Sequence, residues 1–256
     1  MRSPRPLDEA ALIMCARCGP AFVLIFFSGL IISGQFPVIS PNMTPEQLAT
    51  FYRTDTNMIR TGLLISFVSS ALYLPFTAVI STQLRRMEGS TPILAYAQFA
   101  GGMGTIVALL FTMSLLLIAA YRPERAPEIT QMLHDASWIT NVITLNTYCI
   151  QYAAIARAVI KDNEYSEEPI FPRWIIYINY LTGLSFIIDV MLAFYRTGPF
   201  AWNGLLALYV PATFFGAWFF CMAHVLTKAI RRQAQLEREQ FQQVAPDAAV
   251  LLHAGY

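Results

Sequence analysis

One acidic residue, Asp189, stands inside an otherwise apolar run at residues 186–191. Helical spacing places three polar residues on the same face of that segment: Ser185, Thr182 and Asn179. A carboxyl group held among apolar side chains can bind a proton, a cation or the polar group of a ligand. Arg196 follows seven residues later, about 10 Å along the same face. The alternative is a structural carboxylate that forms an ion pair with Arg196, Arg60 or Arg122.

A second polar stripe has spacings of three and four residues, and it comprises His134, Ser137, Asn141, Thr144, Tyr148 and Gln151. Such stripes either join helices through hydrogen bonds or line a polar cavity, and both interpretations stay open. We expect the two stripes to face each other. The candidate ligand-binding residues are Asp189, Asn141, Ser185, Thr182, Thr144, Tyr148 and Arg196.

Charge is scarce along the chain, and it is clustered. Only 13% of the 256 residues are charged and 56% are hydrophobic, whereas a soluble domain has roughly 25% charged residues. Long stretches almost without charge alternate with short charged segments, which is typical of membrane spans and their loops. We therefore predict an all-α bundle of six transmembrane helices, each of about 20 residues or more. They cover residues 18–38, 63–84, 93–120, 136–157, 174–195 and 203–227.

The distribution of Lys and Arg predicts the orientation. Twelve of the seventeen lie in the segments on one side, which include both termini, and five lie on the other side. Because cytoplasmic segments carry the excess of positive charge, we expect both termini in the cytoplasm. Residues 1–230 then form the transmembrane domain, and residues 231–256 form a cytoplasmic helical extension with a flexible tail.

The few histidines and lysines restrict cofactor chemistry. His134 is predicted at the outer end of the fourth span and His224 near the inner end of the sixth, so one chain cannot build a bis-histidine haem or a His-rich di-iron site. Lys161 and Lys228 both lie at cytoplasmic ends, too far out for a retinal Schiff base. No phosphate-binding loop, dinucleotide motif or nucleophile elbow is present, and a net charge of +1 argues against nucleic acid.

Four cysteines fall in the cytoplasmic halves of the predicted spans or at their entrances: Cys15, Cys18, Cys149 and Cys221. We expect neither a disulfide, because the cytoplasm is reducing, nor a metal site. We also expect no cofactor, and the absence of any nucleophile–base pair or metal cluster argues against an enzyme.

Local motifs predict how some helices begin and break. Thr44-Pro45-Glu46-Gln47 is a capping box with proline at the first turn, which predicts a short helix in the first outer loop. Pro75 and Pro211 should kink or locally break the second and sixth spans. Small residues four apart, such as Gly29 and Ser33, predict close helix contacts.

Three segments resemble landmarks of uncharacterised six-helix bacterial inner-membrane proteins. They are Leu-Arg-Arg-Met-Glu-Gly at 84–89, Phe-Pro-Arg-Trp at 171–174 and Thr-Gly-Pro-Phe-Ala-Trp-Asn-Gly at 197–204. The resemblance extends over most of the chain, from the first span to the sixth. It implies a multi-pass protein of the bacterial inner membrane, and it implies no catalytic or binding residue.

The leading hypothesis is binding or transport of a small, mostly apolar molecule, with the polar faces of the fourth and fifth spans holding its polar group. The alternative is a non-catalytic subunit or assembly factor of a larger membrane complex. The expected partners are the lipid bilayer, a small hydrophobic ligand, and a second copy or another membrane-complex chain, with no nucleic acid.

Overall fold

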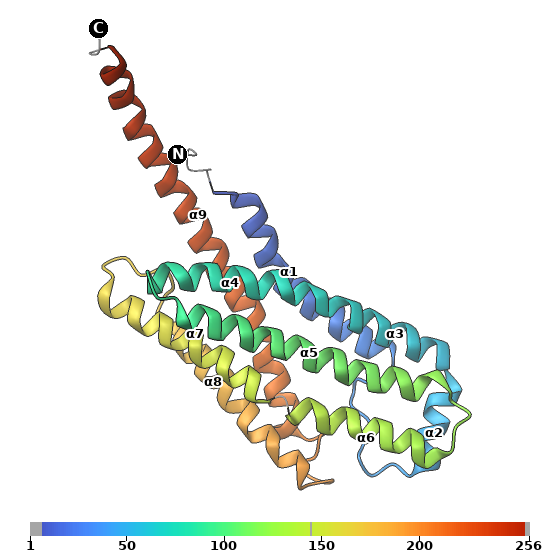
Figure 1. Ribbon diagram of the computed structural model, residues 1–256. Coiled ribbons are helices and arrows are strands. Elements are labelled where there is room, and N and C mark those ends of the chain that lie inside the picture. Colours follow the sequence, from blue (N-terminus) through green and yellow to red (C-terminus); the bar gives the residue numbers. More distant parts are fainter. Residues whose placement is uncertain (1–6, 144, 254–256) are drawn as a thin grey trace.

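The protein is all-helical. A computed structural model describes residues 7–143 and 145–253. It does not describe the side chains of residues 142, 143, 145, 146, 241 and 243–253. Helices account for 81% of the structure, and the described residues include no strand. The helices form one elongated bundle from which α9 and the start of α1 protrude at the end where both termini lie (Figure 1). The helices and helical turns are α1 (Glu9–Ile32), α2 (Pro45–Thr54), α3 (Thr56–Ser69), η1 (Ser70–Leu72), α4 (Tyr73–Glu88), α5 (Ile93–Tyr121), α6 (Pro127–Ile143), α7 (Leu145–Tyr165), α8 (Trp174–Asp189), η2 (Val190–Ala193), η3 (Leu205–Tyr209) and α9 (Val210–His253). The residues assigned to the predicted tail thus continue α9 as far as His253.

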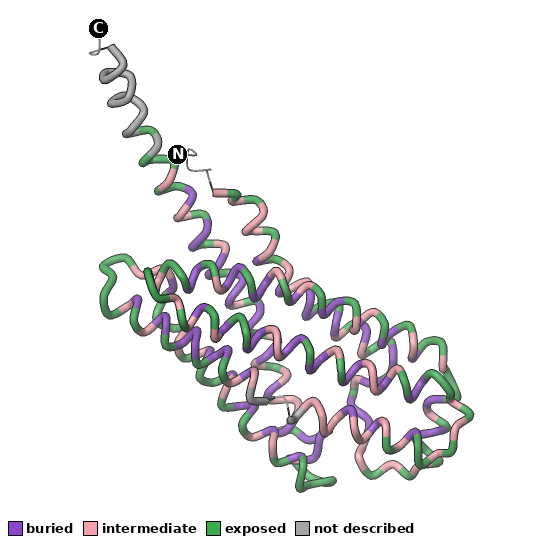
Figure 2. Tube along the Cα trace, viewed as in Figure 1, coloured by how far each residue is buried: buried purple, intermediate pink, exposed green. Residues whose placement is uncertain are grey.

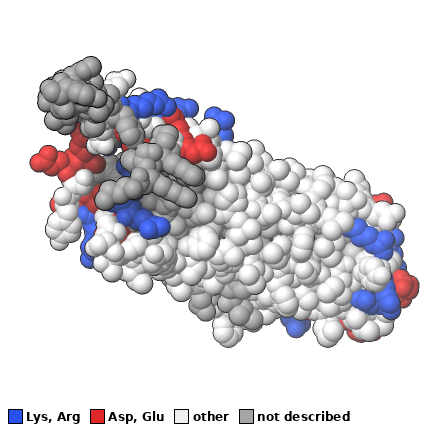
Figure 3. Space-filling view, turned by 45° about the horizontal axis from the view of Figure 1, so that its top comes forward, with Lys and Arg blue, Asp and Glu red and all other residues white. Residues whose placement is uncertain are grey.

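Five stretches of the described chain are long and apolar enough to cross a membrane: Glu9–Ile32, Thr56–Glu88, Ile93–Tyr121, Trp174–Ala193 and Leu205–Gln240. Charged side chains gather at the two ends of the molecule, and a broad band almost free of them lies between (Figure 3). Exposed apolar residues occupy the outward faces of the helices, whereas buried residues follow the inner faces (Figure 2). These features are those of a multi-pass membrane protein.

The predicted fourth span, 136–157, corresponds to the end of α6 and most of α7. It is not among the five candidate spans. The residues of its polar stripe explain the difference, because they dilute the apolar character of the segment. Both α6 and α7 nevertheless pack against the long helix α5.

The two predicted proline breaks are confirmed. Pro75 has no N–H to donate to the carbonyl of Ala71, four residues earlier, and Ala71 lies in the η1 turn that separates α3 from α4. Pro211 stands in the same relation to Ala207, which lies in η3, the wide helical turn before α9. Both breaks therefore lie where a backbone hydrogen bond cannot form.

The predicted capping box is also confirmed. The Gln47 N–H donates to Thr44 Oγ1 at 3.3 Å, and the Thr44 N–H donates to Gln47 Oε1 at 2.9 Å, so α2 begins at Pro45. Two arginines then join this end of the molecule to the end of α5. Arg60 donates to the carbonyls of Ala120 and Tyr121, and Arg53 donates to those of Pro123 and Arg125.

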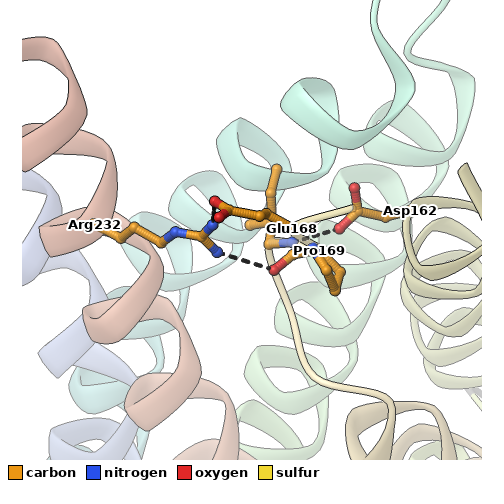
Figure 4. Close-up of polar contacts among 5 residues, drawn as sticks. Asp162, Glu168, Pro169 and Arg232 are labelled. Atoms are coloured by element: carbon orange, nitrogen blue, oxygen red, sulfur yellow. Dashed lines mark hydrogen bonds and ion pairs between the residues drawn. The ribbon is translucent and has the colours of Figure 1, made fainter. Parts of the chain in front are cut away.

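At the other end, the loop between α7 and α8 fixes the position of α9 (Figure 4). The Ile170 N–H donates to the Asp162 carboxylate at 2.6 Å, which holds the loop against α7. Arg232 of α9 forms an ion pair with Glu168 and donates to the Pro169 carbonyl at 3.4 Å. Both contacts lie in the charged region beyond the apolar band.

Helices α1 and α3 cross at a pair of glycines. A Cβ atom on Gly29 would lie 2.5 Å from the Gly62 carbonyl oxygen, and one on Gly62 would overlap the backbone of Gly29 and Ser33. The Ser66 hydroxyl donates to the Phe26 carbonyl at 2.8 Å across the same contact. The missing side chains therefore allow the two backbones to touch, as expected of small residues between membrane helices.

We predict that Gly62→Ala lowers the unfolding free energy by about 1–3 kcal/mol, because the added methyl group meets rigid backbone. Gly216→Ala is the matched control, since its Cβ would lie 3.9 Å from the Val23 side chain, an ordinary contact. The control should be neutral or up to about 1 kcal/mol more stable through helix propensity. Thermal unfolding in detergent measures both; equal effects of the two substitutions would contradict the close crossing.

Candidate functional site

A cavity of about 110 Å³ lies inside the bundle, between α1, α5, α6, α7, α8 and the start of α9. Its walls are mostly apolar, and aromatic rings make up much of them. The rings belong to Phe26, Phe27, Phe36, Trp138, Tyr148, Phe186 and Phe215. The Tyr148 ring stacks on Phe186 with centroids 4.7 Å apart, and it meets Phe215 edge-on at 6.1 Å. Tight ring packing thus fixes one wall.

Three side chains from three different segments bring unpaired oxygens to this cavity. Gln35 follows α1, Thr112 lies on α5 and Asp189 ends α8, and their residues are 1%, 5% and 7% exposed. Within the described chain, Gln35 Oε1, Thr112 Oγ1 and Asp189 Oδ1 have no hydrogen-bond partner. Leaving such a buried group unpaired costs about 1–3 kcal/mol. Three such oxygens at one cavity are what a site for a polar group requires.

The structure brings together three of the residues that the sequence singled out: Asp189, Asn141 and Tyr148 all line the cavity. Thr182 and Ser185 do not line it. Their hydroxyls donate to carbonyls of their own helix, those of Ile178 and Thr182, each at 2.7 Å. Thr144 lies outside the described residues.

Arg196 does not reach the cavity either. Helix α8 ends at Asp189 and the chain continues through the η2 turn, so helical spacing no longer relates the two residues. Arg196 is exposed, and its backbone carbonyl accepts a hydrogen bond from Asn42 at 3.1 Å. In the described part of the chain Asp189 forms no ion pair, and Arg60 is bonded to the end of α5.

Sequence reasoning missed Gln35 and Thr112. Gly34, with φ of +67°, turns the chain after α1 and leads into Gln35. Thr112 is a hydroxyl in the long apolar helix α5. No spacing rule joins these two residues to Asp189, because the three meet only through the packing of distant helices.

A buried hydrogen-bond network adjoins the cavity on the side of α2. Gln35 Nε2 lies 3.3 Å from the Tyr52 hydroxyl, which lies 3.0 Å from His134 Nδ1. The Trp138 indole N–H donates to His134 Nε2 at 3.2 Å. The Trp138 ring stacks on Trp202 with centroids 6.2 Å apart. Gln35 and Trp138, the two ends of this network, both line the cavity.

The tautomer of His134 follows from this network. An indole N–H can only donate, so His134 Nε2 must be the bare nitrogen and Nδ1 must carry the proton. The Nδ1–H group then donates to the Tyr52 oxygen.

The cavity therefore offers apolar contact, hydrogen bonding and one carboxyl group, that of Asp189. Among the described residues, no group of three or more His, Cys, Asp or Glu side chains lies close enough to hold a metal ion. Comparisons of the chain with protein-family models, with curated proteins and with solved structures found no match.

Proposed function

We propose that the protein binds or transports a small, mostly apolar molecule in the cavity, where Asp189, Gln35 and Thr112 hold its polar group. The observation that supports this is the convergence of three buried, unpaired oxygens on one apolar, ring-lined space. Ligand sites have this composition: largely apolar walls with a few polar groups that fix orientation. The sequence predicted a site between the fourth and fifth spans alone; the proposed site also includes Gln35, which follows α1, and Thr112 of α5.

The size of the cavity limits its occupant. Its volume of about 110 Å³ is somewhat below the ~150 Å³ of an engineered cavity that binds benzene. A single six-membered ring is therefore about the largest group that the cavity can enclose. The cavity is only partly enclosed, so a longer chain attached to such a ring can extend outwards.

We further propose a topology of six spans in a bacterial inner membrane, with α6 and α7 together as the fourth and both termini in the cytoplasm. The start of α1 and the end of α9 lie at the same end of the bundle (Figure 1), which supports an even number of crossings. Five candidate spans are present, and α6 and α7 return along α5. The excess of Lys and Arg at the end with the termini supports its cytoplasmic location.

Cysteine labelling tests this topology. In a variant without the four native cysteines, we expect Glu46→Cys and Glu128→Cys to react with a membrane-impermeant maleimide added to intact cells. Tyr165→Cys and Gln240→Cys should react only after the membrane is opened. All four positions are exposed, so accessibility alone does not separate them. Labelling of position 240 in intact cells would reverse the orientation.

Two threonines offer a matched test of the cavity. Thr112 and Thr130 are both buried with unpaired hydroxyls, but only Thr112 lines the cavity. With cyclohexanol as the probe, we expect Thr112→Val and Asp189→Leu to weaken binding at least tenfold, because each removes a polar partner. Thr130→Val should bind cyclohexanol as the native protein does, and cyclohexane should bind all four proteins alike.

Ligand-dependent shifts of the thermal midpoint in detergent measure these affinities. Because the replaced oxygens are unpaired, none of the three variants should be strongly destabilised. A severely unstable Asp189→Leu protein whose affinity for cyclohexanol is unchanged would assign Asp189 a structural role instead.

A further inference from the structure

The hydrogen-bond network beside the cavity fixes more than the tautomer of His134. Tyr52 is fully buried, and its hydroxyl has one hydrogen and two lone pairs. One lone pair accepts the His134 Nδ1–H group, since Trp138 occupies Nε2. Among the described residues, the remaining neighbour of the hydroxyl is the amide of Gln35. How these two groups pair decides which end of the Gln35 amide faces the cavity.

The Gln35 amide can meet Tyr52 in two ways, which differ by a half-turn about its last torsion. If Nε2 donates to the Tyr52 oxygen, the tyrosine hydrogen has no acceptor and Gln35 Oε1 has no donor. After the half-turn, the Tyr52 O–H group donates to Oε1, and the Nε2 hydrogens face the cavity. The second arrangement satisfies the buried hydroxyl and the buried carbonyl together. It is favoured because unpaired buried groups are costly.

We infer that Gln35 presents an N–H donor to the cavity, and that the site selects an apolar molecule carrying a hydrogen-bond acceptor such as a carbonyl oxygen. This inference rests on the proposed function and names its ligand class. Tyr52 and His134 are then positioning residues, because they act through Gln35, whereas Trp138 both fixes the tautomer of His134 and lines the cavity itself. Thr112 is compatible with either kind of ligand, since its hydroxyl rotates to donate or to accept. The Asp189 carboxyl, which lines the same cavity, is compatible with an acceptor when it is protonated, because it then carries an O–H donor.

Two probes of nearly the same shape separate a carbonyl acceptor from plain apolar contact: cyclohexanone and methylenecyclohexane. Their affinities for the purified full-length protein are measured in detergent by thermal shift or calorimetry. The informative quantity is the ratio of the two dissociation constants, compared between variants, because differences in hydrophobicity between the probes then cancel.

Gln35→Met keeps the length of the side chain and removes the donor, so the preference for the ketone should fall about tenfold. Tyr52→Phe removes the hydroxyl that orients the Gln35 amide, and Trp138→Phe removes the N–H group that fixes the tautomer of His134. In each variant the preference for the ketone should fall about threefold. Trp202→Phe is the matched control. Its indole N–H donates to the Ile39 carbonyl at 2.8 Å, outside the network, so the ratio should not change.

The outcomes separate the two proposals. If neither probe binds the native protein, the cavity is not a ligand site and both proposals fall. If both probes bind but Gln35→Met leaves their ratio unchanged, the proposed function stands and the donor assignment is overturned. A rise in ketone preference in Tyr52→Phe or Trp138→Phe would mean that Gln35 presents its carbonyl. A fall in both variants, with the control unchanged, supports the inference.

Discussion

Every polar group inside the apolar part of this bundle has to find its partner within the protein, because lipid offers none. Helices meet that demand for the backbone, and most side chains meet it locally. The hydroxyls of Thr182 and Ser185 donate to their own helix. Between helices, the Tyr73 hydroxyl donates to Gln151 at 2.8 Å and the Gln98 amide donates to Thr77 at 2.7 Å. Against this background, Gln35, Thr112 and Asp189 stand apart, because the polar groups that they leave unpaired meet at one cavity.

The polar stripe along α6 and α7 shows two roles that polar residues take in membrane helices. Gln151, at its inner end, joins α7 to α4, which is the ordinary interhelical bond of such proteins. Asn141 and Tyr148, further out, line the cavity. His134, near the start of the stripe, is bonded on both ring nitrogens. The inner end of the stripe thus joins two helices through a hydrogen bond, and residues further out form part of the cavity wall.

The fold was predictable from the sequence to the extent that it depends on local chemistry. The scarce, clustered charge of the sequence predicted the five candidate spans. The prolines predicted the breaks at η1 and η3, and the capping box at Thr44 predicted the start of α2. The segment 136–157 is not among the candidate spans, because the polar stripe along α6 and α7 makes it less apolar than the others. In each case the deciding interaction lies within a few residues along the chain.

The candidate site was predictable only in part, since residues far apart in the sequence build it. Helical spacing found Asp189 and Asn141 because each breaks an apolar pattern within its own helix. The same spacing, extended past the end of α8, placed Arg196 on the face of Asp189, whereas the η2 turn leads it to the surface. Gln35 and Thr112 carry no such local signal.

The position of Gln35 depends on contacts on both sides of it. The crossing of α1 and α3 at Gly29 and Gly62 sets how close the end of α1 lies to its neighbours, and Gly34 then turns the chain towards the cavity. Tyr52, on the outer helix α2, provides the partner for the amide. Apolar packing therefore decides where the amide lies, and the polar network decides which of its ends faces the cavity. Because different residues control these two properties, the hydrogen-bonding preference of the site can change while the fold remains intact.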